Sequence, residues 1–170
     1  MKKLLFILLC VTLTFSCVNN EGNGVYKKDP LQTIDTTFKS GDNYVGEWKN
    51  GKPNGKGTYT YDNGEIYEGD HKNGLRNGSG IYTFLNGNGY WSGEFKDGKL
   101  HGKGISCIGK FEWSGEFKDG KLPEGTLSFN GIGIYVGELK DGKMHGKGKM
   151  TYADGTVKEG LFENGRFIGE

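Results

Sequence analysis

The stretch WSGEFKDGKLHGKG, from Trp91 to Gly104, is repeated along most of the chain, with near-copies beginning at Trp113 and Tyr135. Its leading glycine recurs at spacings of 23, 24, 22, 22 and 23 residues. These glycines are Gly46, Gly69, Gly93, Gly115, Gly137 and Gly160, and each has another glycine five residues later. A fixed period of this length indicates an array of small units that cannot each bury a face alone.

Each unit carries an aromatic ring two residues before its leading glycine and an acid directly after it. The rings are Tyr44, Tyr67, Trp91, Trp113 and Tyr135, and the acids are Glu47, Asp70, Glu94, Glu116 and Glu138. The sixth unit is short and departs from the pattern, because Lys158 replaces the ring and Leu161 the acid. Terminal units of an array commonly differ in this way, since one side faces solvent.

Within one unit the pattern predicts two strands. Tyr44, Gly46 and Trp48 fall on one face at period two, while Glu47 and Lys49 fall on the other. An Asn-Gly turn follows, and such pairs supply the positive φ angles that hairpin turns require. We therefore expect an all-β protein: an elongated, single-layer antiparallel meander of repeated β-hairpins with about twelve short strands.

The composition requires that aromatic rings stabilise this sheet. The 170 residues include 32 glycines, far above the usual share of about 7%. Glycine cannot fill a core, so we expect the rings to cover glycines of neighbouring strands. The repeat-defining set is Tyr44, Gly46, Trp48, Tyr67, Gly69, Trp91, Gly93, Trp113, Gly115, Tyr135 and Gly137.

The unit Tyr-x-Gly-Glu-Trp-x-x-Gly-Lys-x-x-Gly-x-Gly-x-x-x-Tyr, at residues 44–61, resembles the MORN repeat. The resemblance covers residues 38–170, and six copies in phase make it specific. It implies a β-hairpin array with interaction and membrane-proximal roles. Phe38, Gly41 and Tyr44 repeat the spacing of a unit's second half, so residues 33–43 are expected to form an N-terminal cap.

The N-terminus has the features of a bacterial lipoprotein. Two lysines precede a short apolar run, which fits a signal peptide over residues 1–16. Ser16 and Cys17 resemble a lipobox, which implies lipidation of Cys17, although Thr14 and Phe15 depart from that motif. The alternative is an ordinary signal peptide or a retained anchor with Cys17 incidental. Residues 17–32 are expected to be a flexible tether, and residues 33–170 the repeat array.

The charged residues form columns rather than converging on one point. The possible interaction surface is Glu47, Glu94, Glu116, Glu138, Lys49, Lys96, Lys118 and Lys140. These columns form either a solvated face that discourages edge pairing or a charge-matched docking strip. The net charge of +1 becomes −1 when Lys2 and Lys3 are removed with the signal peptide, so nucleic acid is not an expected partner.

The residues give no indication of catalysis, a metal or a cofactor. His101 and His145 stand two units apart, about 19 Å at the strand spacing of a sheet, too far for one metal. His71 replaces a ring and is expected to be a spacer. The Gly-x-Gly pairs lack the third glycine and the helix of a dinucleotide site. The facing of Cys107 is ambiguous: counting from Gly104 places Ile108 with the rings, whereas counting back from Trp113 places Cys107 there.

We therefore predict a non-catalytic, lipid-anchored scaffold or protein-interaction module at the outer membrane or periplasmic face of the cell envelope. The expected partners are the membrane, through the N-terminal lipid, and a protein. The alternative function is a surface lipoprotein that binds glycan or another ligand through an aromatic face. Exposure of Tyr44, Trp48, Trp91 and Trp113 distinguishes the two, because rings that bind sugar must be open.

Overall fold

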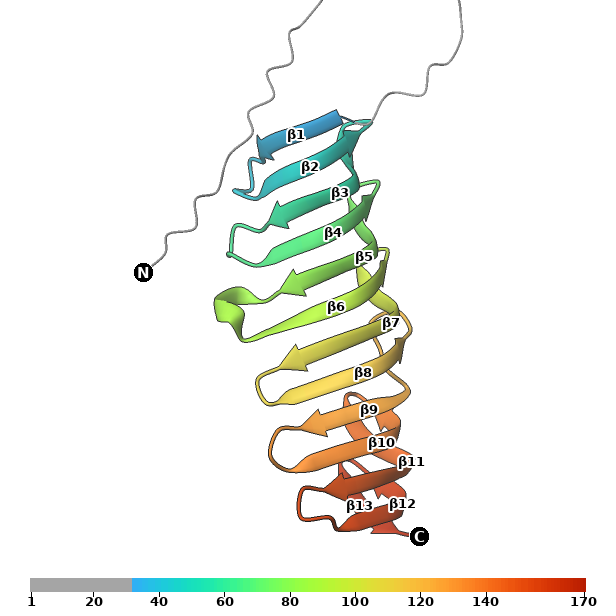
Figure 1. The fold of residues 1–170 in the computed structure, drawn as a ribbon. Coiled ribbons are helices and arrows are strands. Elements are labelled where there is room, and N and C mark those ends of the chain that lie inside the picture. The colour runs from blue at the N-terminus through green and yellow to red at the C-terminus, as the bar shows by residue number, and fades with distance from the viewer. Residues whose placement is uncertain (1–31) are drawn as a thin grey trace, which may run out of the picture.

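The computed structural model describes residues 32–170, which form one open sheet of 13 antiparallel strands paired in sequence order (Figure 1). The predicted fold class is confirmed, with one strand more than the approximate number expected. The predicted signal peptide, the lipidation site Cys17 and nearly all of the tether lie outside the described residues.

The strands are short and connected by tight turns. Their bounds are β1 Gln32–Thr37, β2 Asn43–Lys49, β3 Lys52–Thr60, β4 Ile66–Lys72, β5 Leu75–Thr83, β6 Gly89–Lys96, β7 Lys99–Ile108, β8 Phe111–Phe117, β9 Glu124–Phe129, β10 Gly133–Lys140, β11 Lys143–Tyr152, β12 Val157–Glu163 and β13 Arg166–Gly169. A single 3-10 turn, Leu85–Gly87, interrupts the connection from β5 to β6. Over residues 32–170 no helix has the length and apolar character needed to span a bilayer.

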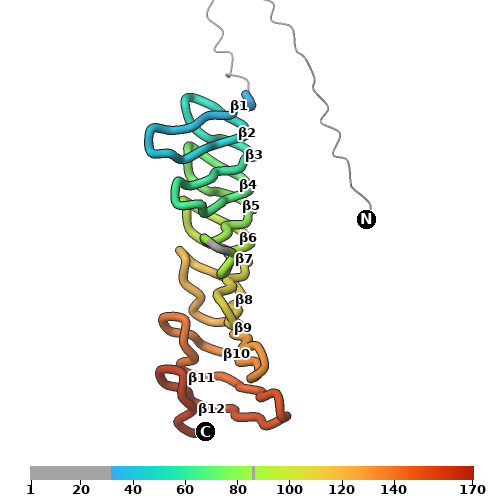
Figure 2. The backbone as a smooth tube through the Cα atoms, turned by 90° about the vertical axis from the view of Figure 1, so that its left-hand side faces the viewer, coloured from blue at the N-terminus to red at the C-terminus, as the bar shows by residue number. Residues whose placement is uncertain are grey.

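A continuous row of glycines crosses the sheet from β2 to β12, with each glycine directly opposite the next across the strand pair. In strand order the row is Gly46, Gly57, Gly69, Gly80, Gly93, Gly104, Gly115, Gly125, Gly137, Gly148 and Gly160. Seen from the side, the hairpins do not lie in one plane, so the sheet is not flat (Figure 2). Register shifts directly after Gly46, Gly69, Gly93 and Gly137 show that the first strand of these units bulges at the row.

Tyrosine rings cover this row in the first, second and fifth units, as predicted. A Cβ added to Gly57, Gly80 or Gly148 would overlap the ring of Tyr44, Tyr67 or Tyr135, and all three tyrosines are fully buried. Each hydroxyl donates to a backbone carbonyl three residues on: Tyr44 Oη to Glu47 O at 2.7 Å, Tyr67 to Asp70 at 3.0 Å and Tyr135 to Glu138 at 2.9 Å. Burial raises the pKa of Tyr44 to about 12, so its hydroxyl keeps the proton that it donates.

In the third and fourth units the expected ring coverage is wrong, and leucine takes its place. Leu100 lies over Gly104, and Leu122 lies over both Gly115 and Gly125. Trp91 and Trp113 are only half-buried. The indoles extend along the sheet instead: Trp91 stacks on a neighbouring tyrosine and Trp113 reaches the next hairpin turn. A branched aliphatic side chain therefore covers the glycines, from β7 in the third unit and from the segment just before β9 in the fourth.

The core is a ribbon of side chains on one face of the sheet, which we call the ring face. One cluster contains Tyr67, Tyr82, Phe95, Leu100 and Phe117, and the other contains Leu127, Tyr135, Leu139, Met150 and Phe162. The extensive contacts between strands join consecutive strands. Stability therefore comes from nearest-neighbour packing, as expected for a repeat array.

Six hairpin turns repeat the same backbone geometry. The first turn residue has φ between 49° and 53° at Asn50, Asn73, Asp97, Asp119, Asp141 and Asn164, and the glycine after each also has positive φ. Positive φ at both central positions is the requirement of a type I′ turn. Turn glycines also connect neighbouring hairpins, because the Gly74 and Gly98 amides donate to the carbonyls of Pro53 and Arg76 at 2.9 and 3.0 Å.

The register settles the facing of Cys107. Ser106 pairs with both Trp91 and Trp113, so it lies on the ring face. Cys107 pairs with Tyr90 and Glu112 on the opposite face. The count from Gly104, which placed Ile108 with the rings, is correct, and the count back from Trp113 is wrong, because the turn between β7 and β8 shifts the phase.

His71 occupies the ring position of the second unit, where other units have Trp48, Phe95 or Phe117. It is buried between Tyr44 and Tyr67, at ring-centroid distances of 5.2 and 5.0 Å and nearly perpendicular to both. Its Nδ1 lies 3.2 Å from the Gly69 carbonyl oxygen, whereas the buried Nε2 has no hydrogen-bond partner among residues 32–170. Burial lowers the pKa of His71 from its ordinary value of 6.5.

We predict that His71→Phe stabilises the protein and removes part of its acid sensitivity. Above pH 6.5 His71 is neutral and its contribution to the free energy of unfolding is complete. That contribution is lost as the pH falls from 6.5 toward the lowered pKa, because only the unfolded chain accepts the proton readily. Removing the unpartnered buried nitrogen should add about 1 kcal/mol at neutral pH. Thermal unfolding of both proteins on each side of pH 6.5 measures this, and an equal fall in Tm for both would contradict the assignment.

Candidate functional site

The face opposite the rings, which we call the open face, carries a shallow groove along the glycine row. Three hollows over this row share residues at their junctions: Ser92 and Gly93 at the first, Gly115 and Glu116 at the second. The groove therefore continues from β2 to β10. Its floor is glycine backbone, because the residues on either side of each glycine in the strand point toward the open face and form the two walls.

One wall of the groove mixes branched aliphatic and hydroxyl side chains, with the acid Glu68 among them. The residues of this wall lie opposite one another on successive strands from β2 to β10: Val45, Thr58, Glu68, Ile81, Ser92, Ile105, Ser114, Thr126 and Val136. Val45, Ile81 and Val136 are 44%, 48% and 53% exposed. Branched aliphatic side chains at this exposure, repeated along one line, form an apolar strip within reach of a partner.

The opposite wall is charged, and it contains the acids that follow the leading glycines. Four of these acids accept a hydrogen bond from a backbone amide nine residues later, in the second strand of the same unit. The pairs are Glu47 with Lys56 N at 2.7 Å, Asp70 with Ser79 N at 3.0 Å, Glu94 with Lys103 N at 3.4 Å and Glu138 with Lys147 N at 3.0 Å. The amide belongs to the ladder that the bulge interrupts, so the carboxylate satisfies it.

Glu116 differs from the other acids of the column. The fourth unit lacks one residue before Gly125, and no hydrogen bond from a backbone amide to Glu116 is found in residues 32–170. Glu116 is exposed and lines the groove where two hollows join. The acid column therefore has a structural role in four units, whereas within residues 32–170 the Glu116 carboxylate has no such backbone partner.

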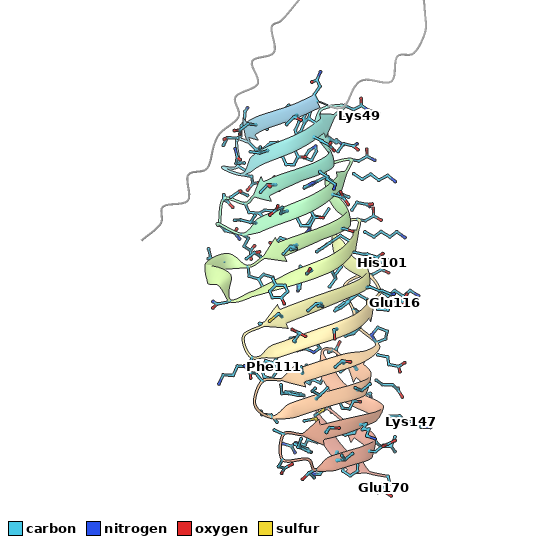
Figure 3. The ribbon with its side chains drawn as sticks, viewed as in Figure 1. Lys49, His101, Phe111, Glu116, Lys147 and Glu170 are labelled. Carbon is cyan, nitrogen blue, oxygen red and sulfur yellow. The ribbon has the colours of Figure 1, made fainter. Side chains whose placement is uncertain are left out.

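The lysines of the column lie at the hairpin turns along one long edge of the sheet. Lys49, Lys96, Lys118 and Lys140 stand opposite Lys52, Lys99, Lys121 and Lys143 on the adjacent strand. We call these four pairs the lysine edge. Like charges that lie directly opposite each other in a sheet are destabilising. In Figure 3, Lys49, His101, Glu116 and Lys147 project from this edge, whereas Phe111 projects from the other.

The ring face does not offer a continuous aromatic platform. Tyr44 is fully buried, and Trp48, Trp91 and Trp113 are half-buried. The buried tyrosine column is thus structural. Within residues 32–170, no group of three or more histidine, cysteine or acidic side chains is arranged to hold a metal ion.

The open hairpin array defines a class of β-hairpin repeat proteins, and comparison with known proteins identifies the family. A family model for the MORN repeat matches residues 44–66, 67–89, 91–106 and 135–157, together half of the chain. The chain therefore belongs to the MORN-repeat family. No curated protein shows significant similarity to it.

The fourth and sixth units fall outside the family matches, and both depart from the repeat pattern. The fourth unit lacks a residue and uses Leu122 in place of a ring over its glycines. The sixth has Lys158 in the ring position. Both still continue the glycine row, through Gly115 and Gly160. The glycine row therefore continues even through units whose sequence does not match the family model.

We predict that Glu47→Ala destabilises the protein by about 1 kcal/mol, because it leaves the Lys56 amide without its partner. The matched change Glu116→Ala should alter stability by less than about 0.5 kcal/mol, the usual range for an unconstrained surface site. Urea unfolding of the two variants and the wild type measures the difference. Equal losses would show that the acid column acts through its overall charge rather than through these hydrogen bonds.

Proposed function

We propose that this protein is a non-catalytic, lipid-anchored scaffold of the cell envelope whose groove binds an extended segment of a partner protein. MORN repeats support the coarser part of this proposal, a module for protein interaction or membrane binding. The groove between the apolar and charged walls is the observation that carries the finer part.

The shape of the groove favours an extended chain as its occupant. It is long, shallow and open, with no deep end, and its lining repeats with each hairpin. The amides and carbonyls of the glycine row are used within the sheet, so the ligand cannot add as a further strand there. It would lie across the strands and place side chains against the two walls.

The charges of the groove favour a segment with apolar and basic side chains. Glu68, Asp70, Glu94, Glu116 and Glu124 line it, against Lys56, Lys103 and Lys118. Basic groups of a ligand would pair with these acids, and apolar groups would rest on Val45, Ile81 and Ile105. Such complementarity contributes chiefly to specificity and rate of association.

Site-specific photo-crosslinking in native cells tests the groove. A benzophenone amino acid at Ile81 or Ile105 should capture one discrete partner, whereas the same group at Ile132, which is 54% exposed on a turn between β9 and β10, should not. Ser92→Leu, which fills the groove between these two sites, should abolish capture. Ser128→Leu makes the same change on the open face outside the groove lining and should leave capture intact. Capture from Ile132, or capture that persists in Ser92→Leu, would contradict the proposal.

The membrane anchor rests on the N-terminal sequence alone. If Cys17 is the lipid attachment site, Cys17→Ser should leave an unprocessed precursor and abolish labelling by a clickable fatty acid. The larger precursor on a gel and the loss of label are the two readouts. Labelling equal to that of the wild type would contradict the lipoprotein assignment.

A second candidate function, direct contact with an acidic membrane surface, is favoured by the lysine edge. Each basic group near an anionic surface contributes about 1 kcal/mol of attraction. Co-sedimentation of residues 33–170 with phosphatidylglycerol-containing vesicles, but not with phosphatidylcholine vesicles, would support it. Binding should fall when Lys96, Lys118 and Lys140 are changed to Gln, and binding that is unchanged would exclude the lysine edge as the contact.

A further inference from the structure

A pocket of about 260 Å³ opens on the ring face, close to the lower end of the range of small-ligand sites. Trp91, Leu100 and Phe117 supply its apolar lining, and Arg76, Ser106 and Asp119 stand among its polar residues. The groove lies on the opposite face of the sheet. The lining of the pocket and the lining of the groove have a single residue in common, Phe117.

The pocket exists because a core side chain is small in this unit. The residue opposite the ring of each unit is Tyr59, Tyr82, Ser106, Leu127 or Met150. Only Ser106 among these five is not a large apolar or aromatic residue. It lies between Trp91 and Trp113, so the space that a larger side chain would occupy remains between two indoles.

The next unit shows the same architecture closed. The Trp113 indole N–H donates to the Gly142 carbonyl in the turn of the following hairpin, at 2.9 Å. Trp91 is the equivalent residue and Gly120 the equivalent glycine, and both line the pocket. Trp91 instead stacks on Tyr82, with centroids 5.3 Å apart and planes at 29°. No hydrogen bond between this indole and Gly120 is found within residues 32–170, so a gap remains where Trp113 makes its contact.

The polar groups at the pocket carry both signs of charge, and one of them, Arg76, is held in place by its contacts. Arg76 donates to the Gly98 carbonyl oxygen at 2.6 Å and stacks over Tyr82 at 4.4 Å from the ring centroid. Asp119 lies 3.5 Å from His101 and its side chain is 68% exposed. Lys99 also lines the pocket. Ser106 lines the same pocket, and no hydrogen bond of its hydroxyl is found among residues 32–170.

We propose that this pocket binds one pyranose unit of a glycan. The weakly positive C–H groups of a sugar would rest on the negative face of an indole or phenyl ring. Its hydroxyls would accept from Arg76 or Lys99 and donate to Asp119 or Ser106. A purely aromatic ligand would fill the gap but leave these polar groups desolvated without partners, which is costly. This inference is independent of the groove and of its protein partner.

Saturation-transfer NMR with chitotriose, maltotriose, cellotriose and benzoate tests the proposal on residues 33–170. At least one trisaccharide should bind saturably, with a Kd of about 10 mM or tighter, as expected for one small site. Ser106→Leu introduces the residue that the next unit has at Leu127, fills the pocket and should weaken binding at least tenfold. Ser128→Leu, on the other face, should not change binding.

A second variant keeps the test decisive if Ser106→Leu disturbs folding. Asp119→Asn preserves the turn, because asparagine occupies the same positive-φ position at Asn50, Asn73 and Asn164, and it should weaken binding severalfold with an unchanged Tm. The proposal is overturned if none of the three trisaccharides binds at about 10 mM, if benzoate alone binds, or if both Ser106→Leu and Asp119→Asn bind sugar as the wild type does.

Discussion

The packing of tyrosine rings on glycine backbone is the interaction on which this sheet depends. A single-layer sheet has no second layer to bury its side chains, so its core must be made within one face. The glycine row provides the space: Tyr67 can lie flat over Gly80 only because no Cβ is there. The hydroxyl of the same ring then bonds the Asp70 carbonyl at the bulge, which fixes the local bend. One residue pair thus supplies packing, curvature and a satisfied polar group.

The same row creates the candidate site on the opposite face. On the open face the same glycines are bare backbone, and the residues on either side of each glycine point outward and form the two walls. Acids such as Asp70 hold the second strand at the bulge and also line the charged wall of the groove. Structure and binding surface are therefore built from the same positions, and each added hairpin lengthens the groove by one unit. The units differ at the position opposite the leading ring. Ser106 leaves a gap there in the third unit, whereas Leu127 and Met150 fill the corresponding space in the fourth and fifth units.

Much of the fold could be predicted from the glycine spacing and the alternation of residues such as Tyr44, Gly46 and Trp48. The open meander, the type I′ turns and the tyrosine coverage all follow from local pattern. The groove was missed because it requires the register across strands: Val45, Ile81 and Ile105 are far apart in sequence and align only once every strand is paired. That Glu47 reaches the Lys56 amide depends on a bulge, which the pattern of alternation does not reveal. The leucine substitution over Gly104 and Gly115 was also missed, because Trp91 and Trp113 occupy the expected ring positions and only their packing shows that they extend elsewhere.

The stability of Gly80→Ala tests the central role of the glycine row most directly. Gly80 has an ordinary strand conformation, so alanine there meets no backbone strain, and its higher strand propensity would by itself favour the variant. The added Cβ would lie 2.6 Å from Cε2 and Cζ of Tyr67. If rings rest on bare backbone, urea unfolding should show a loss of about 1 to 3 kcal/mol, the usual cost of overpacking, while Ser79→Ala on the open face should cost far less. Equal or greater stability of Gly80→Ala would contradict the account, because it would mean that the ring does not need the glycine.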